Sequence, residues 1–131
     1  MSTESELKII RREKRKTTNH QSGIDAEGIA ASYLEREGYK ILAKRYKCKA
    51  GEIDIIAQKD NLVAFVEVKS RKSALLDDPI GRRGRQRIAN AALQYISENP
   101  QIADMDMRFD FIFVDSTLAV NHTEAAWIME T

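Results

Sequence analysis

Two segments, Gly51-Glu52-Ile53-Asp54-Ile55-Ile56 and Phe65-Val66-Glu67-Val68-Lys69, decide the predicted fold. Both have the β-branched and aromatic composition of buried strands. The only break between them contains Asp60-Asn61, a pair whose residue types favour a two-residue hairpin turn. With that turn, counting outward along both strands places Asp54 directly opposite Glu67. The sequence therefore predicts an antiparallel hairpin with two acids side by side.

The two acids share their predicted face of the sheet with Lys69, since strand side chains alternate between faces. Directly opposed side chains have Cβ atoms ~5 Å apart. Two carboxylates among Ile, Val and Phe are costly unless a cation lies between them. Mg²⁺ and Mn²⁺ take oxygen ligands and are commonly held by one or two carboxylates with water and substrate phosphate. We therefore interpret Asp54 and Glu67 as metal ligands.

Lys69 could orient or deprotonate the attacking water, or neutralise charge on a scissile phosphate. The plainer alternative is an ion-paired strand edge in which Lys69 forms a salt bridge with one acid across the sheet. One lysine cannot neutralise two carboxylates, however, so the opposed Asp54 favours the metal site.

Two further glutamates are candidates for the same site. Glu27 falls on the apolar stripe of a predicted first helix, which would aim it at the acid pair. Its place near the helix N-terminus is equally explained by the helix dipole. Glu52 has the parity of Asp54 and could lie in an outer shell of the site, or it could simply be an exposed residue at the start of a strand.

The chain of 131 residues is long enough for one domain with a substantial core, and 43% of it is hydrophobic. Residues 1–21 are polar and basic, which predicts a flexible arm before a single domain over residues 22–131. No apolar run approaches the length of a membrane span, and the N-terminus lacks a signal-peptide pattern. The single cysteine, Cys48, excludes an internal disulfide. We expect a cytoplasmic protein without membrane association.

Positive charge is concentrated near the predicted acids. Residues 69–87 carry seven Lys or Arg against two acids, whereas residues 98–131 carry one against seven. Charge runs are often only solvated faces, but this one starts at the acid pair, as a phosphodiester substrate would require. We predict that a flexible basic loop and its flanks contact backbone phosphates rather than bases, through Arg71, Arg82, Arg83, Arg85 and Arg87.

The sequence predicts both helices and strands. Ser22 is the predicted N-cap of a helix that ends at Gly38. Strands are expected at residues 40–47, 53–58, 62–70 and 108–115, with a short last strand at 125–129. A loop over residues 71–84 precedes a second helix that ends near Asn99. This order of helix, three strands, helix and strand predicts an α/β sandwich with helices on a mixed central sheet. The two histidines, His20 and His122, are isolated in the sequence.

The spacing of Asp54 and Glu67-x-Lys69 resembles that of the PD-(D/E)XK nuclease superfamily. The longer strings are similar to the YraN family of uncharacterised bacterial proteins, which is related to Holliday-junction resolvases; they are Tyr33-Leu34, Gly38-Tyr39, Gly51-Glu52-Ile53-Asp54, Phe65 to Arg71, Arg87-Ile88 and Arg108-Phe109-Asp110. The resemblance covers roughly residues 22–128. It implies a restriction-endonuclease-like fold, metal-binding Asp54 and Glu67, catalytic Lys69, an acid role for Glu27 and a homodimer.

Three hypotheses follow. The first is a Mg²⁺- or Mn²⁺-dependent DNA endonuclease that acts on branched or otherwise structured DNA. The second is a nucleic-acid-binding protein that keeps the fold with little or no catalysis. The third is a scaffold domain whose acids are structural. Cleavage that depends on Glu67 would separate the first from the others.

Overall fold

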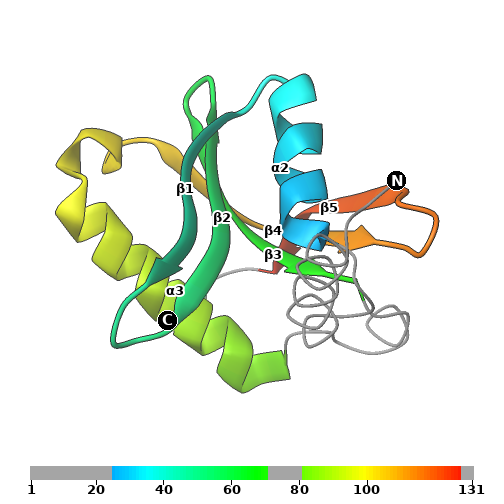
Figure 1. The fold of residues 1–131 in the computed structure, drawn as a ribbon. Helices are drawn as coiled ribbons and strands as arrows, with labels where there is room; N and C mark the ends of the chain where they lie inside the picture. Colours follow the sequence, from blue (N-terminus) through cyan, green and yellow to red (C-terminus); the bar gives the residue numbers. More distant parts are fainter. Residues whose placement is uncertain (1–24, 71–80, 128–131) are drawn as a thin grey trace, which may run out of the picture.

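The computed structural model describes residues 25–70 and 81–127 (Figure 1). The predicted N-terminal arm and Arg71 lie outside these residues. In chain order the elements are α2 (Ala26–Arg36), β1 (Lys40–Lys47), β2 (Glu52–Lys59), β3 (Leu62–Lys69), α3 (Gly81–Glu98), the 3-10 helix η2 (Pro100–Ile102), β4 (Asp106–Val114) and β5 (Val120–Trp127).

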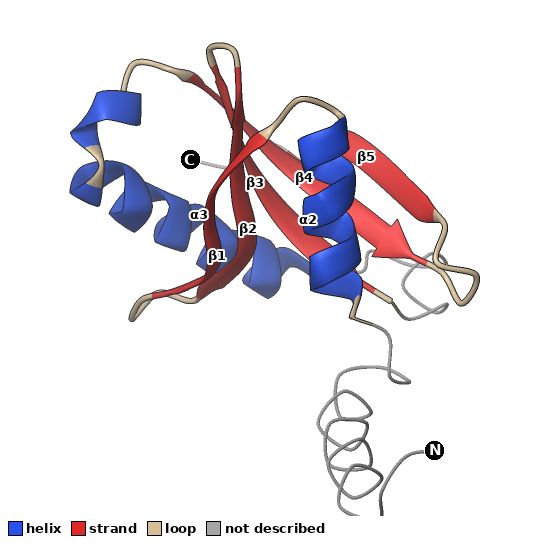
Figure 2. Cartoon of the chain, turned by 45° about the horizontal axis from the view of Figure 1, so that its top comes forward, coloured by secondary structure: helices blue, strands red, loops and turns tan. Residues whose placement is uncertain are grey.

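The five strands form one sheet in the order β1-β2-β3-β4-β5. Neighbouring strands are antiparallel except β3 and β4, which are parallel and are separated in the chain by α3. The two long helices cover opposite faces of this sheet (Figure 2). The predicted α/β class and mixed sheet are confirmed. The last strand is longer than predicted and begins five residues earlier.

Each helix has its own hydrophobic core because the strand residues alternate between the two faces. Ala30 and Leu34 of α2 pack with Ile55, Val66 and Ile112. On the other face, the core of α3 contains Ile53, Ile56, Phe65, Ile88, Ala91, Ala92, Tyr95 and Phe109. β4 is therefore buried from both sides, as its apolar residues at consecutive positions predict.

The predicted hairpin register is confirmed. Lys59 pairs with Leu62 across the Asp60-Asn61 turn, and the ladder continues as far as Ile55 and Val66. Asp60 has φ 52°, a left-handed conformation that aspartate tolerates better than most residues.

The first helix starts later than predicted. Its N-cap is Asp25, whose carboxylate accepts a hydrogen bond from the backbone N–H of Gly28 at 2.9 Å. Asp25 is therefore the N-cap in place of the predicted Ser22. The predicted end is confirmed: Gly38 has φ 95°, and the Tyr39 and Gly38 N–H groups donate to carbonyls of the last turn, as in a Schellman motif.

The predicted basic loop is wrong at its C-terminal end, since α3 already begins at Gly81. Gly81 and Gly84 lower helix propensity by roughly 1 kcal/mol each relative to alanine. Packing of the apolar stripe of α3 against the sheet outweighs this cost. The arginines from Arg82 onward are thus presented by a helix. In the described residues no helix is long and apolar enough to cross a membrane.

Candidate functional site

The hairpin register brings Asp54 beside Glu67, one residue beyond the last ladder pair. One carboxylate oxygen of Asp54 accepts a hydrogen bond from the backbone N–H of Val68 at 2.8 Å. The side chain of Asp54 thus binds the β3 backbone where the β2–β3 ladder ends. The side chain of Glu67 is only 13% exposed. The two acids therefore lie together at the end of the hairpin opposite its turn.

The acid pair is electrostatically unfavourable without a cation. Burial raises the pKa of Glu67 to about 9, and the hydrogen bond and charge of the neighbouring Asp54 carboxyl add to the rise. Lys69 acts in the opposite direction, but its Nζ lies 3.5 Å from Glu67 Oε1 and its side chain is 39% exposed. One proton therefore stays on the pair at neutral pH in the absence of metal.

Glu27 is bound elsewhere in this structure. Its carboxylate accepts a hydrogen bond from Arg45 Nε at 2.7 Å and forms an ion pair with that guanidinium. The β1–β2 register pairs Lys44 with Ile55 and Tyr46 with Ile53, so Arg45 stands opposite Asp54. The hydrogen bond and charge of Glu27, with smaller contributions from Glu52 and Asp54, raise the pKa of Arg45. Arg45 is a cation beside the candidate site that the sequence did not indicate.

The chain departs from simple strand alternation at this point. Ile53 and Ile55 have the same parity, yet they pack in the cores on opposite faces of the sheet. Arg45, opposite the residue between them, has φ 50°, a left-handed conformation that is uncommon for residues other than glycine. Glu52 opens β2 and is exposed, as the plainer interpretation expected.

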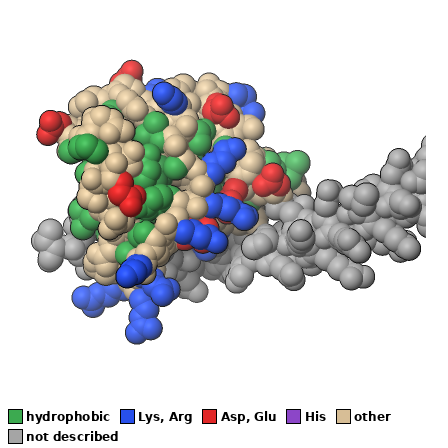
Figure 3. Space-filling view, turned by 60° about the vertical axis from the view of Figure 1, so that its left-hand side comes forward, with side chains coloured by type: hydrophobic (Ala, Val, Ile, Leu, Met, Phe, Trp, Pro, Cys, Tyr) green, Lys and Arg blue, Asp and Glu red, His purple; other side chains and the backbone are tan. Residues whose placement is uncertain are grey.

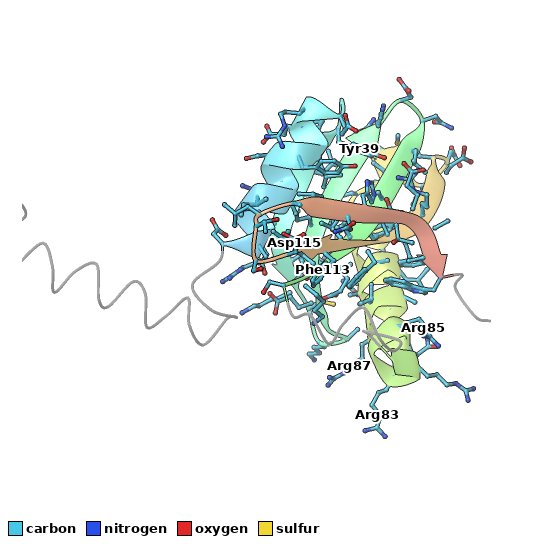
Figure 4. The ribbon with its side chains drawn as sticks, turned by 90° about the vertical axis from the view of Figure 1, so that its right-hand side faces the viewer. Tyr39, Arg83, Arg85, Arg87, Phe113 and Asp115 are labelled. Carbon is cyan, nitrogen blue, oxygen red and sulfur yellow. The ribbon has the colours of Figure 1, made fainter. Side chains whose placement is uncertain are left out.

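The predicted phosphate-binding arginines are arranged along the first two turns of α3. Arg82, Arg83 and Arg87 are exposed, and Arg85 is partly buried. Figure 4 shows Arg83 and Arg87 pointing away from the sheet at the end of the helix. Gly51 ties this region to the hairpin: a Cβ at Gly51 would lie 3.2 Å from Arg87 Cβ and 3.3 Å from its carbonyl oxygen. The arginines thus lie close to the start of β2.

A second charged cluster, which the sequence did not predict, lies between α2 and strands β4 and β5. Asp110 is fully buried and accepts two hydrogen bonds from the guanidinium of Arg108, both 2.7 Å long. Its carboxylate also receives 2.8 Å and 3.1 Å bonds from His122 Nε2 and the backbone N–H of Ala125. These four bonds occupy the acceptor capacity of a carboxylate.

Two tyrosines complete this cluster. The Tyr33 hydroxyl lies 3.0 Å from His122 Nδ1, and Arg108 Nη2 donates to the Tyr39 hydroxyl at 2.6 Å. An ionised carboxylate can only accept, so Nε2 of His122 carries a hydrogen. In the neutral imidazole, Nδ1 then accepts from Tyr33. Burial tends to raise the pKa of Asp110, but the bonds from His122, Arg108 and Ala125 outweigh it and lower the pKa.

A family model supplies the classification of the chain. The model of the uncharacterised protein family UPF0102 matches residues 26–114. The chain belongs to UPF0102. The matched segment of this UPF0102 protein runs from α2 through β4 and contains both acids of the hairpin, Lys69 and Asp110.

Curated UPF0102 proteins of several bacteria are similar over most of their length. One from Rhodopseudomonas palustris is 44% identical over 110 residues, which cover 82% of this chain and 83% of the relative. One from Bradyrhizobium diazoefficiens is 44% identical over 114 residues, covering 85% and 84%. One from Azorhizobium caulinodans is 38% identical over 118 residues, covering 89% and 90%. The UPF0102 assignment carries no named activity.

The donor set of this UPF0102 protein restricts what the acid pair could hold. Among residues 25–70 and 81–127, no group of three or more His, Cys, Asp or Glu side chains could hold a metal ion. Asp54 and Glu67 thus offer two hard carboxylates and leave other positions to water or substrate, which fits Mg²⁺ or Mn²⁺. Burial and the neighbouring Asp54 carboxyl raise the pKa of Glu67, so the doubly ionised pair is unfavourable unless a cation compensates it.

The sequence missed the Asp110 cluster in this UPF0102 protein because its members are scattered over 90 residues. His122 was interpreted as isolated, which is wrong. One signal was present: Arg108 and Asp110 share parity with Ile112 and Val114, which pack in the core beneath α2. Two opposite charges two residues apart on a buried strand face predict an internal ion pair.

Proposed function

We propose that this UPF0102 protein is a metal-dependent endonuclease that hydrolyses phosphodiester bonds in DNA. The observation that carries the proposal is the Asp54–Glu67 pair with Lys69 beside it, in which a buried carboxyl has its pKa raised to about 9. A structural ion pair would be balanced in charge, but this cluster has two acids and one partly exposed lysine. Lys69 does not neutralise the second carboxylate, so the pair needs a proton or a metal ion, and this need supports a cation site.

Each side chain has a definable task in hydrolysis. Asp54 and Glu67 would hold Mg²⁺ or Mn²⁺, and Val68 N–H keeps the Asp54 carboxylate oriented. When bound, such an ion polarises a phosphoryl oxygen and lowers the pKa of bound water. Lys69 is exposed enough to reach a substrate, where its ammonium could orient the water or neutralise negative charge developing on the phosphate. Arg82, Arg83 and Arg87 would hold the DNA backbone.

Glu27 and Glu52 have more peripheral places in this proposal. The Glu27 carboxylate is bound to Arg45, so it would act on the site by fixing this guanidinium next to Asp54, or would change partner when DNA binds. Glu52 would contribute negative charge from the start of β2.

Purified protein incubated with Mn²⁺ or Mg²⁺ and a panel of linear, flapped and four-way DNA tests the proposal. We expect metal-dependent cleavage of at least one substrate, and a loss of at least about 100-fold in Glu67→Gln, which keeps the shape of the side chain and removes its charge. Glu37→Gln, an exposed glutamate at the end of α2, is the matched control. Cleavage that survives in Glu67→Gln would overturn the proposal.

The second candidate is a nucleic-acid-binding protein without efficient catalysis. It is favoured by one observation: Glu27 is engaged by Arg45, and it forms no three-acid group with Asp54 and Glu67 in the described residues. DNA binding that depends on the arginines of α3, together with no cleavage under any metal, would select this candidate.

A further inference from the structure

The edge strand β1 and the turn after it form a second basic segment. Between residues 40 and 51 the chain has five Lys or Arg and no acid. All five are exposed: Lys40, Lys44, Arg45, Lys47 and Lys49. The N-terminal half of α3 likewise has Arg82, Arg83, Arg85 and Arg87, and the first acid in that helix is Glu98.

Most of this charge is not used within the part of the chain that the structure describes. Arg45 is paired with Glu27. Lys44, Lys47 and Lys49 form no ion pair with a described residue, and the same holds for Arg82, Arg83 and Arg87. Lysines on an edge strand also discourage aggregation, which explains their presence on β1. That role does not require them to gather at the end of β1 that lies beside the acid pair.

The two basic segments meet at the turn between β1 and β2. Cys48 and Gly51 exchange backbone hydrogen bonds of 2.9 and 3.2 Å in this turn. Gly51 approaches Arg87 so closely that a Cβ would lie 3.2 Å from Arg87 Cβ. Figure 3 looks toward the side of the molecule that carries α3 and β1, where Lys and Arg side chains follow one another across the surface. Charges far apart in the sequence therefore belong to one surface.

The candidate site lies between these segments. On one side, Arg45 of β1 stands opposite Asp54 in the β1–β2 register. On the other side, Arg87 lies against the residue that precedes β2. Basic residues thus lie on both sides of the carboxylates, and this arrangement suits a polyanion that passes over the site and continues in both directions.

We propose that Lys44, Lys47 and Lys49 of the β1 segment, together with Arg82, Arg83 and Arg87 of α3, form one basic band that binds duplex DNA across the acid pair. Lys44 and Lys47 lie on β1 and Lys49 in the turn that follows it, whereas the three arginines lie in the first two turns of α3. That the DNA is also a substrate rests on the proposed function; its binding does not.

Salt-dependent affinity for a 20-base-pair duplex, measured by fluorescence anisotropy in EDTA, tests the band. Each lost phosphate contact lowers the magnitude of the slope of log K against log salt by about 0.9. We expect a fall of about 2 to 3 for the strand variant Lys44→Ala/Lys47→Ala/Lys49→Ala. A similar fall is expected for the helix variant Arg82→Ala/Arg83→Ala/Arg87→Ala, and the two should add in the combined variant.

The matched control, Arg36→Ala/Lys40→Ala/Lys59→Ala, removes three exposed charges: one at the end of α2, one at the start of β1 and one at the end of β2. Its slope should be close to that of the wild type.

An unchanged slope in the strand variant, or an equal fall in the control, overturns the proposal. Equal losses on duplex and on single-stranded DNA of the same length overturn the assignment to duplex. Binding of vesicles containing phosphatidylserine that is lost in the strand variant, with DNA binding unchanged, would assign the surface to a membrane.

The outcome is separable from that of the proposed function. Binding in EDTA involves no metal and no cleavage. DNA binding that depends on the band, in a protein that never cleaves DNA, would therefore support this inference and contradict the proposed nuclease activity. Conversely, Mn²⁺-dependent cleavage at wild-type affinity and rate in the strand variant would contradict the band and support the nuclease activity.

Discussion

Two acids on neighbouring strands are both largely shielded from solvent but differ in how their charge is compensated. Glu67 on β3 is 13% exposed and faces the Asp54 carboxyl, and among the described residues Lys69 is the one cation that lowers its pKa. Asp110 on β4 is fully buried and receives four hydrogen bonds, two of them from an arginine. Burial acts in the same direction on both acids, yet the pKa of Glu67 rises to about 9 whereas that of Asp110 falls.

The difference teaches that burial alone does not give a buried acid its role. The fold provides Asp110 with a full set of hydrogen bonds and an ion pair, so its charge stabilises the native arrangement of α2, β4 and β5. The negative charge of Glu67 is only partly compensated, so it lowers the stability of the native state until a proton or a metal ion binds. The Asp110 cluster therefore has the properties of a structural ion pair, whereas the Glu67 cluster has those that the proposed cation site requires.

The largest expected effect on stability comes from removing Asp110, the buried acid of the structural cluster. Asp110→Ala should destabilise the protein by about 3–5 kcal/mol, because it leaves Arg108 without its buried partner and frees His122 and the Ala125 N–H. Urea unfolding followed by circular dichroism measures the change.

Asp106→Ala is the control, since Asp106 is an exposed residue at the start of the same strand, and it should change the free energy of unfolding by about 0.5 kcal/mol or less. A loss below about 1 kcal/mol in Asp110→Ala would contradict a structural role for the cluster.

The second prediction concerns the pH dependence of stability in EDTA. The pKa of Glu67 rises from 4.5 to about 9 on folding, so between these values the unfolded chain loses a proton that the native site retains. The contribution of Glu67 to stability is thus unperturbed below pH 4.5 and falls as pH rises, by up to about 1.4 kcal/mol per unit. Between pH 5 and 7 the wild type should lose about 2–3 kcal/mol relative to Glu67→Gln.

Mn²⁺ sharpens this second test because it takes the place of the retained proton. Saturating metal should raise the melting temperature of the wild type, most strongly at high pH, and leave Glu67→Gln unchanged. Parallel stability curves for the two proteins in EDTA would show that Glu67 titrates normally in the native state.

The smallest expected effect concerns the hydrogen bond that joins α2 to β5. Tyr33→Phe removes the hydroxyl next to His122 Nδ1 and should cost about 1 kcal/mol. Tyr95→Phe is the matched control, because this tyrosine packs in the core of α3 and its hydroxyl makes no hydrogen bond with a described residue. Equal losses in the two variants would mean that the Tyr33 hydroxyl adds nothing beyond packing.

Local chemistry made much of the fold predictable. The Asp60-Asn61 turn determined the hairpin register, because a two-residue loop leaves only one way to pair its flanks. Gly38 ended α2 where a left-handed residue was needed. The prediction was wrong at the starts of both helices: Asp25 caps α2, and packing extends α3 over Gly81 and Gly84.

The Asp110 cluster could not be predicted in the same way, because each of its contacts joins segments that only the folded sheet brings together. Tyr33 and His122 are 89 residues apart in the chain. Arg45 beside Asp54 was missed for a related reason, since its position depends on the pairing of β1 with β2 after a register shift between Ile41 and Ala43.

The sequence by itself determined what lies within one hairpin. Asp54 comes beside Glu67 because turn length and strand alternation are local rules, and no other part of the protein is needed to apply them. The tertiary structure alone decided how each charge is compensated. It places an arginine, a histidine and a backbone N–H from two strands within hydrogen-bonding distance of Asp110, and it pairs Glu27 with Arg45. Compensation acts through space over a few ångströms, and distance along the chain carries no information about it.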